Sequence, residues 1–82
     1  MMKRETFDIA NIYVPVKRRA TLNAKTVQDI AASIMELGQQ SPILVRQDGA
    51  RLVLVEGLHR LEACKALGES TIAGYLVQAR KF

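Results

Sequence analysis

Cysteine, histidine, proline and tryptophan are scarce in this chain of 82 residues, which has one cysteine, one histidine, two prolines and no tryptophan. A single cysteine excludes an internal disulfide, so we expect a reducing, cytoplasmic location. One histidine with one cysteine does not make a metal-ligand set, so no metal site is predicted. No apolar run approaches the roughly 20 residues of a membrane span, and residues 1–8 lack the apolar core of a signal peptide.

The composition that remains is typical of a folded domain with a positive charge. Hydrophobic residues make up 49% of the chain and the formal net charge is +4, so we expect one small domain, residues 1–82, with a thin core and modest stability. This charge favours an anionic partner, either a nucleotide or nucleic acid, although an ordinary soluble surface explains it equally well. The basic residues gather near the termini, and the candidates for nucleic-acid contact are Lys17, Arg18, Arg80 and Lys81.

Hydrophobic periodicity predicts an α+β or α/β domain, with a small mixed β-sheet and two helices packed on it; the resemblance described below favours α+β. The predicted order is strand, helix, strand, strand, helix, strand. The strands cover residues 9–16, 42–47, 51–56 and 71–77, and the helices cover residues 24–37 and 58–67. A polar connection is predicted for residues 17–21.

Local signals mark the ends of these elements. Asn23 is a good N-cap for the first helix, and Gly38 can end that helix in a left-handed conformation. Asp48-Gly49 predicts a two-residue hairpin turn. Gly74 indicates a bulge in the last strand.

The junction between the strand 51–56 and the helix 58–67 carries the strongest functional signal. Gly57 ends the strand, allows the backbone to approach a ligand closely, and is followed at once by the helix. A helix start presents backbone N–H groups without a partner inside the helix, and these groups favour anions. His59 and Arg60 add a hydrogen-bond donor and a guanidinium that can hold two phosphate oxygens. The junction therefore predicts a phosphate site.

Each of these residues also has a purely structural interpretation. Gly57 is compatible with a tight turn at positive φ, and His59 and Arg60 are compatible with a solvated surface. Cationic side chains are unfavourable at a helix start, which favours the phosphate interpretation for this pair. Ser33 in the first helix and Arg19 after the first strand are further candidates to complete the site.

Two side chains near the junction are assigned structural roles. Glu62 lies three residues after His59 and can meet it on one helix face, but we expect a surface role for this carboxylate. Cys64 lies near the same helix face as Leu61, so we expect it to be buried and inert. No catalytic residue is predicted.

The residues around this junction resemble a known superfamily. The box Gly57-Leu58-His59-Arg60 is similar to the glycine-and-basic box of the superfamily that contains the ParB N-terminal domain and sulfiredoxin. The ParB pattern leu-ala-x-ser-ile, then gly, then gln-pro-ile-x-val-arg, together with the last strand, resembles residues 30–34, 38, 41–46 and 71–77.

This resemblance covers residues 7–77 and implies a fold and a ligand. The fold would be ParB/sulfiredoxin-like, and the ligand would be a nucleoside triphosphate, CTP or ATP, with Mg²⁺. The residues that would surround the phosphate are Gly57, Leu58, His59, Arg60, Ser33 and Arg19.

Position 58 departs from both branches of the superfamily. ParB proteins have gly-glu-arg-arg in this box and sulfiredoxins have gly-cys-his-arg, whereas this chain has Leu58 and His59 in the middle. Leucine supplies neither the acid nor the sulfur nucleophile, so sulfiredoxin-type reduction is not expected. We therefore expect a binding module rather than an enzyme.

Three functions stay open at this point. The first is a ParB-like nucleotide-binding module in plasmid or chromosome partition or DNA-linked regulation, either as a homodimer or within a longer protein. The second is a non-specific DNA-binding accessory protein with salt-sensitive contacts, because the helix-turn-helix and dimerisation domains of ParB proteins are not expected within residues 1–82. The third is a small phosphotransferase whose general base would be Glu36, Glu56 or Glu62.

Overall fold

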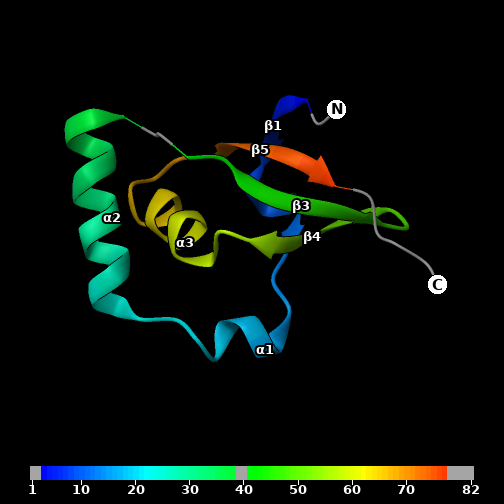
Figure 1. Cartoon of the computed structure of the whole chain (residues 1–82), viewed down its shortest axis with the longest axis horizontal. Coiled ribbons are helices and arrows are strands. Elements are labelled where there is room, and N and C mark those ends of the chain that lie inside the picture. The colour runs from blue at the N-terminus through cyan, green and yellow to red at the C-terminus, as the bar shows by residue number, and fades with distance from the viewer. Residues whose placement is uncertain (1–2, 39–40, 78–82) are drawn as a thin grey trace.

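A mixed sheet and two long helices form the fold of this chain (Figure 1). The computed structural model describes residues 3–38 and 41–77. In chain order the elements are β1 (Arg4–Asp8), the 3-10 helix η1 (Ile9–Asn11), β2 (Ile12–Tyr13), α1 (Val16–Arg19), α2 (Ala24–Leu37), β3 (Ile43–Asp48), β4 (Arg51–Glu56), α3 (Leu58–Ala66) and β5 (Thr71–Val77). None of the helices in these two ranges is long and apolar enough to cross a membrane.

The sheet contains both parallel and antiparallel strand pairs. Its strand order is β1-β5-β3-β4-β2. The central strand β3 runs antiparallel to β4 and parallel to β5. At the edges, β1 is antiparallel to β5 and β2 is parallel to β4. The predicted small mixed sheet is confirmed, with one strand more than the sequence indicated.

The additional strand comes from the N-terminal segment, where the prediction of one strand over residues 9–16 is wrong. β1 begins at Arg4 and ends at Asp8, η1 follows, and β2 covers only Ile12–Tyr13. The predicted polar connection also begins with a short helix, α1. Most side chains of β1 are exposed, so this strand has no apolar pattern and depends on its pairing with β5.

The two edges of the sheet must lie close together, because one short segment joins them. In a flat sheet β1 and β2 would lie about 19 Å apart, four strand spacings of roughly 4.8 Å. The chain from Asp8 to Ile12 can span at most about 14 Å even when fully extended, and η1 shortens it further. The sheet is therefore strongly curled. Ile9 and Ile12, both buried, lie in this crossing segment and fill the inside of the curl.

The core joins the curled sheet to α3. It contains Ile43, Val45, Leu54 and Ile72 from the sheet and Leu58, Leu61 and Cys64 from α3. The burial predicted for Cys64 is confirmed, since its exposed fraction is 0%. By contrast, none of the residues of α2 is buried. Of the two predicted sheet-covering helices, α3 packs directly on the sheet, whereas α2 packs chiefly on α3 (Figure 1) and contacts the core through the partly buried Ile34.

The predicted ends of α2 are confirmed with one refinement. The side chain of Asn23 accepts a hydrogen bond from the backbone N–H of Thr26 at 3.0 Å, as an N-cap does. Gly38 ends the helix at a φ of 81°, but its ψ of 172° is extended rather than left-handed helical.

Two details of the strands differ from their predictions. Asp48 pairs with Arg51, so the two-residue turn consists of residues 49 and 50 and lies one position later than predicted. The predicted bulge at Gly74 is wrong, because this residue pairs regularly with both β1 and β3. A β-carbon there would lie 3.0 Å from the side chain and carbonyl oxygen of Ile43, so this glycine allows close packing. The register shift of the sheet lies at Leu44/Val45 instead.

Candidate functional site

Gly57 forms the turn from β4 into α3 and can do so because it has no side chain. Its φ of 107° and ψ of 29° are left-handed, which strains any residue with a β-carbon. A β-carbon at this position would lie 2.6 Å from Cγ2 of Ile43. The tight-turn interpretation of Gly57 is therefore confirmed, and the space beside its α-carbon is filled by β3.

The first turn of α3 directs backbone donors outward and Leu58 inward. The N–H of Leu61 donates to the carbonyl of Gly57 at 2.9 Å and closes the first helical turn. The N–H groups of Leu58, His59 and Arg60 come before this bond, so they point out of the helix start. The side chain of Leu58 is 7% exposed and belongs to the core. Of Leu58, only the backbone N–H therefore points out of the helix start.

His59 is held by the start of α2. The backbone N–H of Asn23 donates to Nε2 of His59 at 3.0 Å. Accepting this bond uses the lone pair of Nε2 and leaves Nδ1 as the ring nitrogen that can donate. This bond joins residues 36 positions apart and brings the starts of two helices together. The sequence does not predict this bond, because the donor is a backbone N–H, which every residue type except proline has.

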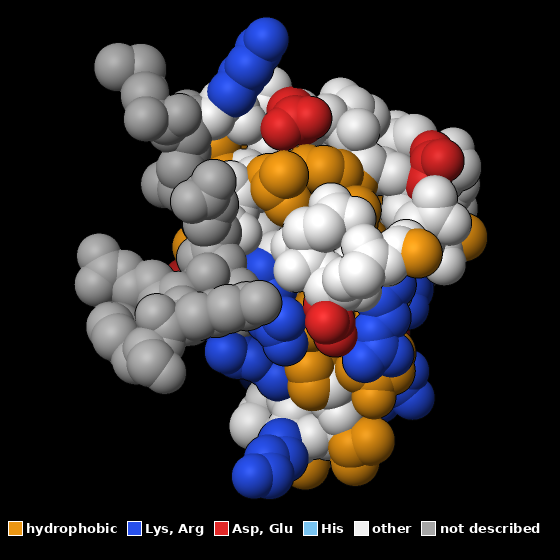
Figure 2. Space-filling model, turned by 90° about the vertical axis from the view of Figure 1, so that its right-hand side faces the viewer, with side chains coloured by type: hydrophobic (Ala, Val, Ile, Leu, Met, Phe, Trp, Pro, Cys, Tyr) orange, Lys and Arg blue, Asp and Glu red, His pale blue; other side chains and the backbone are white. Residues whose placement is uncertain are grey.

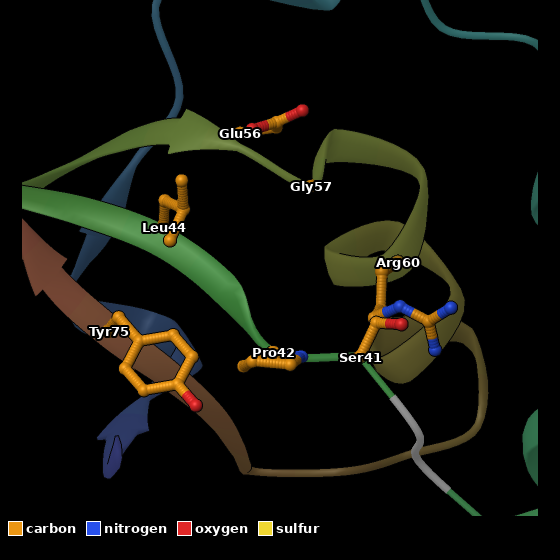
Figure 3. Close-up of a pocket in the computed structure, with 7 residues that line it drawn as sticks. All are labelled: Ser41, Pro42, Leu44, Glu56, Gly57, Arg60 and Tyr75. Atoms are coloured by element: carbon orange, nitrogen blue, oxygen red, sulfur yellow. The ribbon is translucent and has the colours of Figure 1, made fainter. Parts of the chain in front are cut away.

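Arg60 is half-buried and lines a hollow of about 470 Å³ that also contains Gly57. Figure 3 shows Arg60 extending from α3 beside Ser41, with the ring of Tyr75 across the hollow. The remaining lining residues are Pro42, Leu44, Glu56 and Gly57. The hollow thus combines an apolar floor with one cation and one carboxylate.

Two other candidate residues lie apart from this hollow. Arg19 lines a different hollow, together with Leu22, Leu58 and Glu62, so it is near the start of α3 on the side of the α1–α2 connection. Ser33 is exposed on α2 and lines neither of these two hollows. The structure therefore brings Gly57, His59 and Arg60 together, adds Arg19 nearby, and leaves Ser33 outside this group.

Of the four candidate nucleic-acid residues, the structure describes two, and these two lie together. Lys17 and Arg18 are exposed on α1 and line a shallow hollow with Pro15 and Thr21. Arg80 and Lys81 lie outside the described residues. Figure 2 shows several Lys and Arg side chains on the face of the molecule that carries the end of the β3–β4 hairpin. There Arg51 stacks 4.2 Å above the centroid of the Tyr13 ring and pairs with Asp48 at 3.4 Å.

The candidate acids differ in their surroundings. Glu56 is exposed and lines the hollow with Arg60. Glu62 accepts a hydrogen bond from Lys65 at 3.2 Å, which agrees with the surface role expected for it. Glu36 is exposed on α2. Within residues 3–38 and 41–77, His, Cys, Asp and Glu side chains form no group able to hold a metal ion.

Comparison with known proteins decides the family. The ParB N-terminal domain family matches residues 3–81, almost the whole chain. This chain belongs to that family. A probable chromosome-partitioning protein ParB from Campylobacter jejuni is 32% identical to this ParB N-terminal domain over 62 residues. The match covers 76% of this chain but only 22% of that protein, so the chain spans about a fifth of its curated relative.

Solved structures confirm the expected fold. Sulfiredoxin from Arabidopsis thaliana superposes with a TM-score of 0.84 and 26% identity, over 94% of this chain and 86% of its own. The truncated ParB of Caulobacter crescentus in complex with CTP-γ-S gives a TM-score of 0.81 at 24% identity, over 96% of this chain and 46% of that one. A free serine kinase variant in complex with ADP gives 0.78 at 16% identity, over 90% and 30% of the two chains. The ParB/sulfiredoxin-like fold implied by the sequence motifs is thus present.

Proposed function

We propose that this ParB N-terminal domain is a nucleotide-binding module that holds a phosphate group at the start of α3. The observation that carries the proposal is the arrangement of this helix start, where outward N–H groups lie beside His59 and Arg60. Backbone donors, the helix dipole and a guanidinium all favour a phosphate in the same place.

Proteins of the same fold support a nucleotide as the source of that phosphate. The Caulobacter crescentus ParB binds CTP-γ-S, and the serine kinase binds ADP. In this chain the hollow beside Gly57 has an apolar floor of Pro42 and Leu44, which suits the remainder of a nucleotide better than a bare inorganic anion.

Binding without turnover fits the surroundings of position 58. The side chain of Leu58 is 7% exposed and packs in the core, so the position where ParB proteins have a glutamate offers no acid here. The role in partition that relatives suggest would then depend on binding a nucleotide rather than on hydrolysing it.

The experiment is an NMR titration with CTP, ATP and ADP, each with and without Mg²⁺. We expect shifts of the backbone amides of residues 57–62 at millimolar nucleotide or below. Arg60→Gln should weaken binding by about tenfold or more, since a charge-assisted hydrogen bond contributes roughly 1.5–3 kcal/mol. Arg46→Gln is the matched control, because Arg46 is also half-buried but lies on β3 and lines no part of the hollow.

Two outcomes would contradict this proposal. If no nucleotide shifts these amides, the phosphate site is wrong. If a nucleotide is consumed in the presence of a hydroxyl substrate and Glu56→Gln abolishes its consumption, the domain is a phosphotransferase, as the acid in the hollow would allow.

A second candidate function is electrostatic contact with DNA. A ParB of the same fold has been solved in complex with the centromeric parS site. Here Lys17 and Arg18 are both exposed on α1, as phosphate contacts require. A gel-shift assay on non-specific DNA should show binding at low salt that is lost at high salt, and absence of binding at low salt would exclude this function.

A further inference from the structure

The sheet has one face that packs with α3 and an opposite face, which we call the outer face. Successive side chains of a strand point to opposite faces, and Val45 and Leu54 belong to the core together with residues of α3. The residues beside them in the sequence therefore point to the outer face. Strand pairing places four of these side chains in one row across the sheet: Tyr13, Val53, Arg46 and Val77.

Val53 shows that long side chains lie flat on the outer face. It is only 2% exposed, yet it does not belong to the core cluster, so its burial comes from the outer face. Its neighbours in the row are Tyr13 and Arg46, each one strand spacing of about 4.8 Å away. The guanidinium of Arg51 lies 4.2 Å from the centroid of the Tyr13 ring. An aromatic ring and two guanidiniums are therefore laid against this face.

Arg46 carries a charge that no neighbour neutralises. It is half-buried in the central strand β3. Within residues 3–38 and 41–77, no Asp or Glu side chain forms an ion pair with it. Arg51 does pair, with Asp48 at 3.4 Å, and Arg4 adds an exposed cation on the same face. This excess of guanidiniums is complementary to an anionic partner.

A second aromatic ring completes the outer face. Tyr75 of β5 is half-buried and pairs with Leu44 and Arg4 in the next row. In a flat sheet Tyr13 and Tyr75 would lie about 16 Å apart, three strand spacings across and two residues along. These two are the only tyrosines of the chain. Arginines that contact phosphates between rings that stack on bases are the arrangement that binds single-stranded nucleic acids.

We propose that the outer face of the sheet binds single-stranded DNA. Bases stack on the ring of Tyr13 and on the guanidinium of Arg51, and Arg46 binds the phosphates between them. The apolar side chains of Leu44 and Val77 beside these groups suit thymine methyl groups and deoxyribose better than 2′-hydroxyls, so the strand is DNA rather than RNA. This function goes beyond nucleotide binding and does not depend on the phosphate site at α3.

The first measurement compares three nucleic acids. Fluorescence anisotropy gives the affinity of the intact chain for a labelled oligothymidylate of about 12 nucleotides, for oligouridylate of the same length and for a duplex of the same length. We expect the oligothymidylate to bind most tightly. The chain has no tryptophan, so its intrinsic fluorescence comes from Tyr13 and Tyr75. This fluorescence should fall at saturation, because stacking on bases quenches it.

Two variants separate stacking from charge. Tyr13→Ala should weaken binding of oligothymidylate at least about fivefold and leave its salt dependence unchanged, since a stacked base contributes no counterion release. Tyr13→Phe keeps the ring and should retain the affinity. Arg46→Gln should reduce the slope of log affinity against log salt by about 0.7, the value for one phosphate contact on a single strand. Lys25→Gln is the matched control, because it removes an exposed cation of α2 that is paired with Asp29, and it should retain affinity and slope.

Three results would overturn the proposal. The first is no binding of oligothymidylate at low salt. The second is equal affinity for the duplex, or equal losses in Arg46→Gln and Lys25→Gln, either of which would mean general electrostatic contact. The third is tighter binding of oligouridylate, which would make the ligand RNA. The amides of residues 57–62 distinguish the two sites: if nucleotides fail to shift them while oligothymidylate still binds as described, the phosphate site is wrong and the outer face stands.

Discussion

The two long helices of this domain are held in opposite ways. α3 has four buried residues, Leu58, Leu61, Ala63 and Cys64, whereas α2 has none among its 14. α3 is thus part of the core. α2 lies outside the core and packs on α3 through half-buried apolar side chains, and the N–H of Asn23 before α2 donates a hydrogen bond to His59 of α3. The candidate site at the start of α3 therefore lies between a helix of the core and a helix with no buried residue.

Among these predictions, truncating one apolar side chain on each helix should give the largest difference in the loss of free energy of unfolding. Leu61→Ala should lower the free energy of unfolding by about 3–5 kcal/mol, because Leu61 is fully buried and leaves a cavity. Ile34→Ala on α2 should cost about 1 kcal/mol, since Ile34 is only partly buried. Urea unfolding measures both, and equal losses would show that α2 belongs to the core.

The close packing of the chain just before α3 can be tested by replacing each of two glycines with alanine. Gly57→Ala should destabilise the domain by roughly 2–4 kcal/mol, because the new β-carbon meets Ile43 and φ is positive. Gly68 is the matched control, with a φ of 79° and no neighbour within 4 Å of a β-carbon. Gly68→Ala should cost only about 1 kcal/mol. Similar values for the two would contradict the close packing at Gly57.

Removing the N-cap of α2 should lower the free energy of unfolding by a smaller amount and should affect hydrogen exchange in α2 alone. Asn23→Ala removes the bond to the N–H of Thr26 and should cost about 1 kcal/mol. Hydrogen exchange should accelerate along α2 and stay slow in α3, because the two helices differ in burial. Asn23→Asp keeps a capping oxygen and should restore most of the loss. Equal acceleration in both helices would mean that they unfold as one unit.

A substitution at the exposed end of α2 should change the free energy of unfolding least. Met35 is 77% exposed, so Met35→Gln should change the free energy of unfolding by less than about 0.5 kcal/mol. Thermal unfolding at several protein concentrations measures this change. A loss well above that value would show that another surface covers this part of α2.

The elements that the sequence predicted well are those with local signals. α2 follows from an apolar stripe between Asn23 and Gly38, and both ends are where these residues stand. β4 and β5 have the predicted bounds, and the predicted start of α3 is confirmed. In these segments the pattern within ten or so residues is sufficient to determine the structure.

The elements that the sequence missed depend on distant partners. β1 has mostly exposed side chains and becomes a strand by pairing with β5, more than 60 residues later. The four-residue helix α1 is too short to show a periodicity. For the same reason the sequence predicted the Gly57–Arg60 box, which is contiguous, but not the bond between His59 and Asn23. That bond requires the packing of two helices.

The position of β1 sets the order in which the fold can be completed. Arg4 lies opposite Tyr75 in the sheet, so the first strand of this domain to be synthesised pairs with the last strand in the described chain. At roughly 5–20 residues per second, synthesis of the intervening segment takes about 4–14 s. Throughout that time the backbone donors and acceptors of β1 lack their native partner. Contacts between residues so far apart in the sequence slow folding. We therefore expect the pairing of β1 with β5 to be the last step in the folding of this domain.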